Sequence, residues 1–456
     1  MARSARNHRL AALLAEADWS GAELARAVNT LGAAQGLALR YDRTAIAHWL
    51  TGSRPRPAIA ELVAQAFTRR CERLVTAADT GLVQAPYAAA SPAAPGQHGQ
   101  DAAQRLTGLC RADVDPAQRP AVVRSLYSPG IPPGLGTFEP APMPASRLHR
   151  RDRPYTAADV EILHSMASTF ADLTERYGGA HARSSLSAYL ADDISRLLMA
   201  RASSPEVRRE LFAGAAQLTH LLARMSCDAG HVGLAQRYYG VALGLTREAH
   251  DARLYAVTLR AMSVQAQSLG YHRRADHLAD AAVTVAGPDA DPATRSFLLS
   301  QRALTHARMH RRSAAVADLI AAEEQHDRAN TTCGGPFTHY PRAGLDYQRA
   351  QTFLALGDFS QATRALSAAA QGRCESQRRA NALTHARLAE TLLHTGQLEA
   401  SCVHWHTLMD HYPYLRSVPV ARAFSHMRRL LRPHQHQRHV AAVLRRARAL
   451  RSPSPG

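Results

Sequence analysis

One pattern recurs five times in the C-terminal half of the chain, and it restricts the possible folds more than any other feature. Each copy begins with a helix-breaking residue, and a small residue follows five positions later. Counted from that small residue, a residue that is larger in most copies stands at +4, and a small or apolar residue stands at +7. Successive copies start 40, 40, 47 and 39 residues apart. The copies are Gly230/Ala235/Tyr239/Ala242, Gly270/Ala275/Ala279/Ala282, His310/Ala315/Leu319/Ala322, Gly357/Ala362/Leu366/Ala369 and Gly396/Ser401/Trp405/Leu408.

This pattern predicts a stack of helical hairpins. Glycine ends a helix at low cost because it readily adopts a left-handed conformation. A small residue at the start of the second helix lets the two backbones approach, and the residues four and seven positions later lie on the same face. A single hairpin cannot bury that face, so the hairpins must stack. The alternative is a generic helical bundle in which the spacing arises by chance.

The chain divides into four regions by composition. Residues 1–84 have a helical pattern, and 153–432 carry the repeats. Residues 85–152 are rich in Pro, Gly, Ala and Ser and predict a disordered linker with a short helical island at 101–126. Residues 433–456 predict an Arg-rich helix and tail. Since Ala and Leu dominate the apolar residues, we predict an all-α protein.

The charge of the chain excludes some classes of enzyme and favours one class of partner. The formal net charge is +18, and all 55 basic residues are arginine. Without lysine, the chain has no Walker A phosphate loop, no Schiff-base lysine and no Ser–Lys dyad. A basic excess of this size favours a polyanionic partner, for which nucleic acid is the default candidate.

The sequence predicts neither catalysis nor a cofactor. The sequence has no G-x-S-x-G, H-E-x-x-H or G-x-G-x-x-G motif, so we expect no enzyme activity and assign no catalytic residue. The six cysteines are scattered without a C-x-x-C pair, and no apolar run approaches the ~18 residues of a membrane span. We therefore predict a cytoplasmic protein without a membrane partner.

Two histidine-rich segments contain residue types that bind metal ions. Cys402 and His406, with His404 between them, form a possible half-site, but no second cluster completes it and the neighbouring residues belong to the repeat pattern. We predict no metal. From residue 411 to the end there are ten arginines and no acid, so this end either contacts nucleic acid or an acidic partner or is a solvated tail. The second segment, His434-x-His436-x-x-His439, lies in that basic end and is interpreted as surface.

The N-terminal region carries the most specific motif. Ser20 and Glu23 form a capping box that opens a helix containing Leu24-Ala25. A second helix begins after Asp42 and ends near Gly52. Helical spacing predicts that Ile46 and Trp49 face inward. The residues predicted to face outward are Arg43, Thr44, Ala47 and His48, and a basic turn with Ser53, Arg54 and Arg56 follows them.

This segment resembles the helix-turn-helix of the Cro/repressor-type (XRE) family. The likeness rests on Leu24-Ala25, on Ile46-x-x-Trp49 and on the basic, proline-containing loop after Gly52. It departs from the family in the separation of Ala25 and Ile46, which are 21 positions apart and predict an extended helix or a long loop. The repeat pattern resembles the tetratricopeptide repeat, matched best by the first copy, although its period exceeds the usual ~34 residues.

The whole arrangement resembles a group of actinobacterial transcription regulators implicated in development and secondary metabolism. By that resemblance, Arg43 reads guanine, Thr44 contacts a base or a thymine methyl, and Ala47 and His48 share the base-facing side. The basic turn clamps phosphates through the side chains of Ser53, Arg54 and Arg56. The resemblance implies a homodimer on double-stranded DNA, associated with the nucleoid. The alternative for the first 84 residues is a small helical bundle with a solvated, Arg-rich face.

The repeats are expected to sense a ligand or to mediate dimerisation. Stacked hairpins curve, and their first helices line the concave wall. The polar residues of those helices predict a groove for a peptide or small anionic effector, or else a solvated scaffold face. They are Arg224, Arg260, Gln267, Arg302, His306, Tyr347, Arg387 and His394. The leading hypothesis is a sequence-specific transcription regulator, and the alternative is a tetratricopeptide-like scaffold that acts only through protein partners.

Overall fold

The computed structural model describes residues 6–34, 37–71, 75–83, 101–128, 135–141, 154–329 and 340–450. Across these ranges the chain is helical, apart from one isolated β-bridge between Tyr155 and Ala202. The predicted all-α fold is therefore confirmed. None of the helices in the described ranges is long and apolar enough to cross a membrane.

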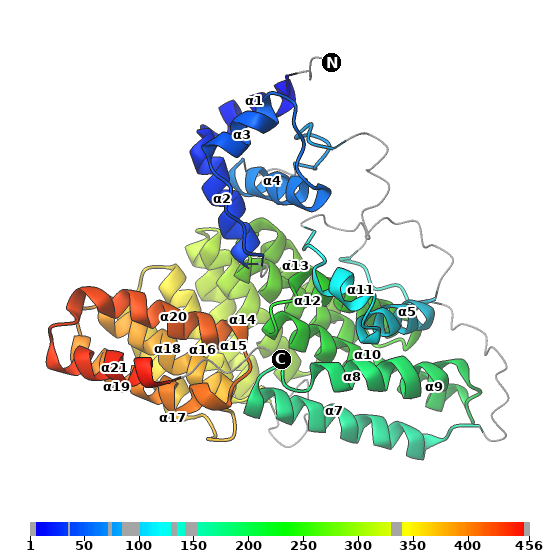
Figure 1. The fold of residues 1–456 in the computed structure, drawn as a ribbon. Coiled ribbons are helices and arrows are strands. Elements are labelled where there is room, and N and C mark those ends of the chain that lie inside the picture. The colour runs from blue at the N-terminus through cyan, green and yellow to red at the C-terminus, as the bar shows by residue number, and fades with distance from the viewer. Residues whose placement is uncertain are drawn as a thin grey trace.

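Residues 6–83, which we call the head, form a small bundle of four helices above the repeats (Figure 1). Their apolar faces share one core, whose fully buried members include Leu10, Leu24, Ile46 and Phe67. The irregular segment 75–83 closes this core. The helices are α1 (His8–Glu16), α2 (Gly21–Ala34), α3 (Arg43–Leu50) and α4 (Pro57–Arg70).

The helical island predicted at 101–126 forms, and most of the remaining predicted linker lies outside the described residues. Two short helices form in the predicted island, α5 (Ala102–Val114) and α6 (Arg119–Val123). Their apolar side chains lie in the same core as the first repeats, so this segment is part of the folded body. A buried ion pair fixes α5, with Asp113 accepting hydrogen bonds from Arg183 at 2.6 and 3.1 Å and from Tyr238 at 2.8 Å.

The rest of the chain begins with a long helix and an interrupted one, followed by five antiparallel pairs and a C-terminal pair. The first elements are α7 (Ala157–Tyr177), α8 (Arg183–Tyr189), the π-helical turn η2 (Leu190–Ile194) and α9 (Ser195–Met199). The pairs are α10 (Pro205–Asp228) with α11 (Val232–Glu248), α12 (Ala252–Ser268) with α13 (His272–Ala286), α14 (Pro292–Arg308) with α15 (Arg312–Arg328), α16 (Arg342–Ala355) with α17 (Phe359–Gln371), and α18 (Arg378–His394) with α19 (Leu398–His411). After the 3₁₀ turn η3 (Tyr412–Tyr414) come α20 (Val418–Leu431), a second 3₁₀ turn η4 (Arg432–His434) and α21 (Arg438–Ala449).

The five predicted breakers are the turns inside the five pairs. All five adopt a left-handed conformation, with φ between 60° at His310 and 88° at Gly230. The residue after each breaker donates its N–H to a carbonyl in the last turn of the first helix, as His231 does to Ser226 at 2.8 Å. The small residue five positions after each breaker is 0% exposed in every copy. The predicted solenoid of helical hairpins is therefore confirmed.

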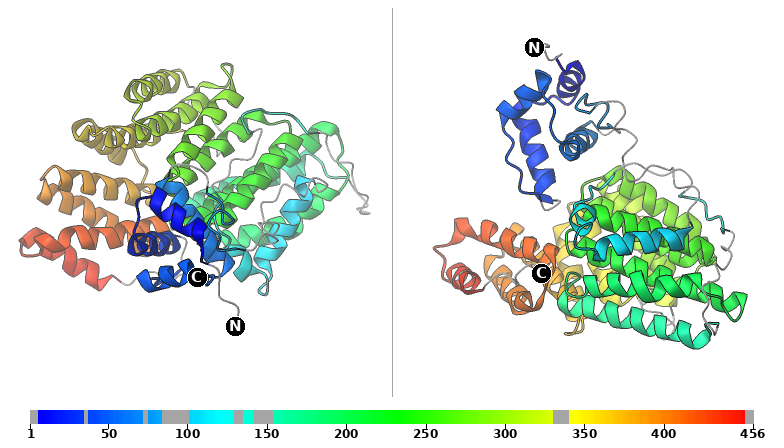
Figure 2. Two further views of the ribbon diagram at one scale, coloured as in Figure 1. Left: turned by 90° about the horizontal axis from the view of Figure 1, so that it is seen from above. Right: turned by 45° about the vertical axis from the view of Figure 1, so that its right-hand side comes forward.

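The solenoid curves until its last pair meets its first helices (Figure 2). Asp228, at the end of α10, joins the two ends of the array. Its carboxylate accepts hydrogen bonds from Arg379 Nε at 2.8 Å, Ser417 Oγ at 2.9 Å and the Gly179 N–H at 2.7 Å. Nearby, the Arg416 N–H donates to the carbonyl of Tyr177 at 2.8 Å. The repeats thus form a closed turn of superhelix rather than an open arc.

The left-handed turns generate a prediction. Gly357→Ala should lower the free energy of unfolding by roughly 1–2 kcal/mol, because an L side chain is strained at φ 79°. Beyond the neighbouring residues, no described atom lies within 4 Å of the new Cβ, so the cost comes from the backbone alone. The matched control is His310→Ala, where a Cβ already occupies a left-handed position. Equal losses in both variants, measured by urea denaturation, would contradict this account.

The closure generates a second prediction. Asp228→Ala should destabilise the protein by roughly 3–5 kcal/mol, because it leaves the Arg379 guanidinium without its buried counter-charge. The control is Asp192→Ala, which removes an exposed pair with Arg196 and should cost about 1 kcal/mol or less. The two carboxylate side chains are 2% and 72% exposed. Thermal unfolding measures both, and similar costs would mean that Asp228 does not hold the ends together.

Candidate nucleic-acid interface

The capping box predicted at the start of α2 is present. The Glu23 carboxylate accepts a hydrogen bond from the Ser20 N–H at 2.7 Å, and the Ser20 hydroxyl accepts one from the Glu23 N–H at 3.3 Å. The bond from the Ser20 backbone is the main reason that the pKa of Glu23 lies below its ordinary value. These bonds satisfy the free N–H groups of the first turn and fix where α2 begins.

An asparagine clamp sets the path of the long connection between α2 and α3. The Asn29 side chain donates to the carbonyl of Tyr41 at 2.8 Å and accepts from the Tyr41 N–H at 2.9 Å. The Tyr41 ring then packs edge-on against Trp49, with ring centroids 5.1 Å apart. Asn29 therefore fixes the chain where α3 begins, a role that the sequence analysis did not assign.

Helix α3 has one buried face and one open face. Asp42 caps it by accepting a hydrogen bond from the Ala45 N–H at 2.9 Å. Ile46 and Trp49 are buried in the head core, as predicted. The helix is only eight residues long and is held by this cap and these two side chains. Its other face is exposed.

All seven residues predicted to contact DNA are exposed. Arg43, Thr44, Ala47 and His48 lie on the outer face of α3, and Ser53, Arg54 and Arg56 lie on the turn that follows. Gly52 starts that turn with φ 104°, a conformation that favours glycine. These seven residues include three arginines and no carboxylate, and the exposed Asp42 precedes them as the cap of α3. We call the surface of the seven residues the α3 face.

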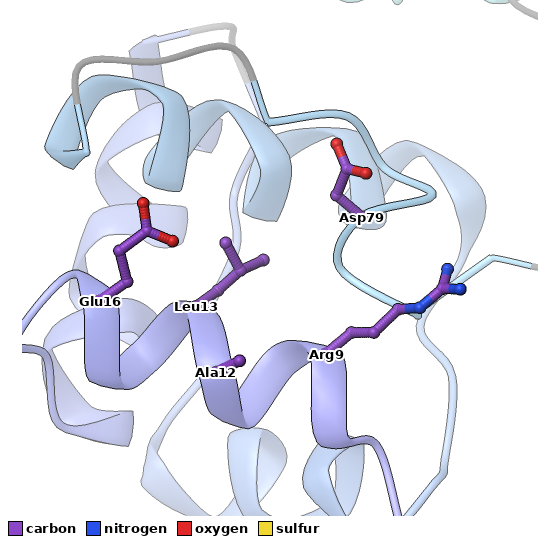
Figure 3. Close-up of a pocket in the computed structure, with 5 residues that line it drawn as sticks. All are labelled: Arg9, Ala12, Leu13, Glu16 and Asp79. Atoms are coloured by element: carbon purple, nitrogen blue, oxygen red, sulfur yellow. The ribbon is translucent and has the colours of Figure 1, made fainter.

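The α3 face is distinct from the pocket on the head (Figure 3). That shallow pocket, of about 310 Å³, lies between α1 and the segment around Asp79. It is lined by two carboxylates, Glu16 and Asp79, and a single arginine, Arg9, so its charge does not suit a phosphate. None of the residues of the α3 face lines it.

The head is docked on the repeats through α4. The Gln65 side chain donates to the carbonyl of Tyr127 at 2.6 Å and accepts from the hydroxyl of Tyr271 at 3.1 Å. The two tyrosine rings stack with centroids 5.4 Å apart, and the Arg69 guanidinium lies 4.7 Å from the Tyr271 ring. Tyr127 follows α6, and Tyr271 immediately precedes α13. Because docking uses α4, it leaves the α3 face open.

The comparison with known families covers the head alone. Residues 10–83 match the SP15 N-terminal domain. The match spans α2, α3 and α4 completely and most of α1, and it ends with the segment that closes the head core. The search of curated proteins found no match to the chain. The description of the matched family names a domain and no activity.

The residues predicted to line an effector groove do not form one site. Arg302 donates to Asp318 through Nε and Nη2, both at 2.7 Å, and His306 Nδ1 lies 3.3 Å from the same carboxylate. Gln267 hydrogen-bonds to Gln301 at 3.1 Å in a buried amide network. His394 is exposed and stacks on Phe359. The remaining four, Arg224, Arg260, Tyr347 and Arg387, belong to a different cluster, which is described below.

Two groups of side chains resemble metal sites in composition. Asp276, Asp280 and His306 place one ligand atom each within 4.8 Å of one another. Arg302 lies 3.8 Å from Asp280, and Arg311 pairs with Asp276. Two guanidinium groups therefore already neutralise these carboxylates, and we interpret the group as an ion-pair network.

The possible half-site around Cys402 is divided among different neighbours. His404 Nδ1 lies 3.0 Å from Nδ1 of His385 on α18, whereas His406 faces Arg446 on α21. Cys402 is buried in the core between these helices. Burial lowers the pKa of both His404 and His406 below the ordinary value. The three side chains thus do not point toward a common centre.

Gln65→Ala should loosen the head from the repeats. It removes the donor to the Tyr127 carbonyl and one of the two partners of the Tyr271 hydroxyl, which should cost roughly 1–3 kcal/mol of docking free energy. We expect faster hydrogen exchange at 121–128 and in the first turn of α13, with the head core still protected. The control is Glu61→Ala, an exposed position on the same helix. Unchanged exchange in Gln65→Ala would mean that other contacts hold the head.

Proposed function

We propose that this protein is a sequence-specific DNA-binding transcription regulator whose head reads DNA through the α3 face. The observation that carries the proposal is the α3 face itself: a capped helix, buried on one side, with its open side continuous with a basic turn. A helix of this kind enters the major groove with side chains that reach base edges, while a basic loop contacts phosphates. The likeness to the Cro/repressor type supports the same assignment.

The docked state of the head is compatible with this function. Because α4 makes the contact with the repeats, the residues of the α3 face stay exposed in the folded protein. The head alone has a modest basic excess, with eleven arginines and seven carboxylates over residues 1–84. Such a head binds DNA weakly by itself, so we infer that two copies act together as a dimer on a two-fold site.

The repeat body supplies the surface for regulation in this proposal. Solenoids of helical hairpins commonly bind peptides, small ligands or protein partners along their curved walls. The docking of the head against Tyr271 gives a repeat helix direct contact with the reading domain. A change in the body can therefore reach the head through packed side chains.

Arginine substitutions on the α3 face test the proposal. The target is an operator selected from a random DNA pool, with affinity measured by fluorescence anisotropy at several salt concentrations. Arg43→Ala should cost about 1–3 kcal/mol and relax the preference at one base position. Arg54→Ala should weaken binding to all sequences alike and reduce the salt slope by about 1.

The control is Arg364→Ala, which removes an exposed arginine from α17, far from the head along the chain. It should leave both the affinity and the salt slope unchanged. Wild-type binding by Arg43→Ala and Arg54→Ala would show that the α3 face does not read DNA. If the wild-type protein selects no DNA sequence at all, a scaffold that acts through protein partners becomes the better account.

A further inference from the structure

Five arginines gather where the two ends of the closed superhelix meet. They are Arg224 on α10, Arg260 on α12, Arg373 in the turn before α18, and Arg379 and Arg387 on α18. We call them the arginine cluster. Glu175 on α7 lies 3.5 Å from Arg224, and its charge also acts on Arg373 and Arg379. Three separate parts of the chain therefore meet around one carboxylate.

Two tyrosines connect the members of the cluster. Burial raises the pKa of Tyr340 to about 12, while the nearby guanidinium groups of Arg260 and Arg373 act in the opposite direction. The Arg373 guanidinium also lies 5.8 Å from the centre of the Tyr347 ring. The Tyr347 hydroxyl in turn interacts with Arg387. On the side of α12, the Arg260 guanidinium lies over the Phe297 ring, which packs edge-on against Tyr340 with ring centroids 4.9 Å apart.

The positive charge of the cluster is only partly neutralised. Arg379 pairs with Asp228 at 2.8 Å, and Arg387 pairs with Glu390 at 2.7 Å. Within the described ranges, no carboxylate lies within 4.0 Å of the guanidinium nitrogens of Arg260 or Arg373. Both use Nε for a protein acceptor, the Phe297 carbonyl and the Thr384 hydroxyl respectively.

The outer edges of these two guanidinium groups are available to a ligand. No hydrogen bond found in the described part of the chain uses the Nη atoms of Arg260 or Arg373, and neither group is among the buried atoms that lack a partner. Arg260 and Arg373 are both partly exposed, and the Arg224 and Arg387 side chains keep 40% and 43% of their surface exposed, so solvent reaches the cluster. The Nε contacts hold both guanidinium groups in place, and the Arg260 guanidinium also lies 3.5 Å from the centre of the Phe297 ring.

Holding these charges together is unfavourable without a counter-ion. Burial lowers the pKa of Arg260 to about 10, and the like charge of Arg224 adds to this effect. Burial also lowers the pKa of Arg373, and Arg379 acts in the same direction. A half-buried cation without a partner carries a desolvation cost that an anion in contact with it offsets.

We propose that the arginine cluster binds a small anion with two or more phosphate or carboxylate groups, held by the Nη atoms of Arg260 and Arg373. A guanidinium fork binds such a group through two parallel hydrogen bonds, so two forks suit a ligand with two acidic groups. The proposal of an anion-binding site does not depend on the proposed function. The role of this site as the effector site rests on the proposed function, since α12 carries Arg260 and leads directly to Tyr271, which contacts the head.

Calorimetric titration of the full chain without DNA tests the site directly. The probes are pyrophosphate and citrate, each compared with potassium chloride at matched ionic strength. We expect saturable binding of at least one probe, and its identity distinguishes a phosphate from a carboxylate ligand. The double variant Arg260→Gln with Arg373→Gln should lose at least about tenfold in affinity, since each fork contributes charge-assisted bonds. The control pair, Arg312→Gln with Arg364→Gln, removes equal charge from exposed positions and should bind as wild type does.

A melting curve shows whether the double variant still folds, because it also loses the Nε hydrogen bonds to Phe297 and Thr384. Unchanged anion binding by a folded double variant would overturn the proposal, and so would binding of neither probe to wild type above the chloride control. Arg224→Gln, at the exposed edge of the cluster, provides a second test if the double variant does not fold. It should weaken binding several-fold, and wild-type affinity would contradict the assignment.

A final measurement tests the effector role separately. The saturating probe is added to the protein–operator complex, and the operator affinity is compared with and without it. A change that disappears in the Arg260/Arg373 double variant supports an effector site. If the probe binds in calorimetry but does not change the operator affinity, the arginine cluster binds an anion without regulating DNA binding. Failure of the protein to bind any operator would refute the proposed function while leaving the calorimetric result intact.

Discussion

The carboxylate of Asp228 holds the two ends of the helical array together, and the arrangement around it depends on that contact. It brings α18 against the end of α10 and the turn after α7 by accepting hydrogen bonds from three separate segments. Repeat arrays normally contact only their neighbours, so an open arc is their usual form. Here the closure places Arg224 near the arginines of α18, which an open arc would keep apart. The arginine cluster therefore exists because the array is closed.

The hairpins could be predicted from the sequence because their determinants are local. A left-handed breaker and a small residue five positions later specify one turn and one close helix contact, whatever the remaining chain does. The closure has no such local signal. Asp228 and Arg379 are 151 residues apart, and neither stands in a motif that names the other as its partner. Their contact depends on the summed curvature of five pairs, which the period alone does not determine.

The same distinction applies to the candidate sites. Helical periodicity was sufficient to separate the buried Ile46 and Trp49 from the exposed Arg43 and His48, since a single helix determines which side faces the core. Periodicity also placed the polar groove residues on the first helices of the pairs, but it could not show which charges lie opposite them. Arg302 meets Asp318 on the second helix of its own hairpin and is neutralised there.

Composition indicated only part of the connection between the head and the body. The sequence predicts a helical island at 101–126, and α5 forms there, but composition does not show that the apolar face of α5 is buried in the repeat core. Its buried Asp113–Arg183 pair joins residues 70 positions apart, and no property of the segment alone reveals it. The hydrogen bond from Gln65 to Tyr127 could not be predicted for the same reason, because Tyr127 lies in the segment that composition assigns to a linker.

Under the proposed function, the docked head also affects how a dimer would sit on DNA. A head on a flexible tether can reach half-sites over a range of separations and on either side of the duplex. A head fixed through α4 moves only with the body, so two copies would present their α3 helices at one distance and one rotational phase. Inserting half a helical turn between half-sites would rotate one of them to the opposite side of the duplex. The folded body would then determine which spacing of DNA half-sites the dimer can bind.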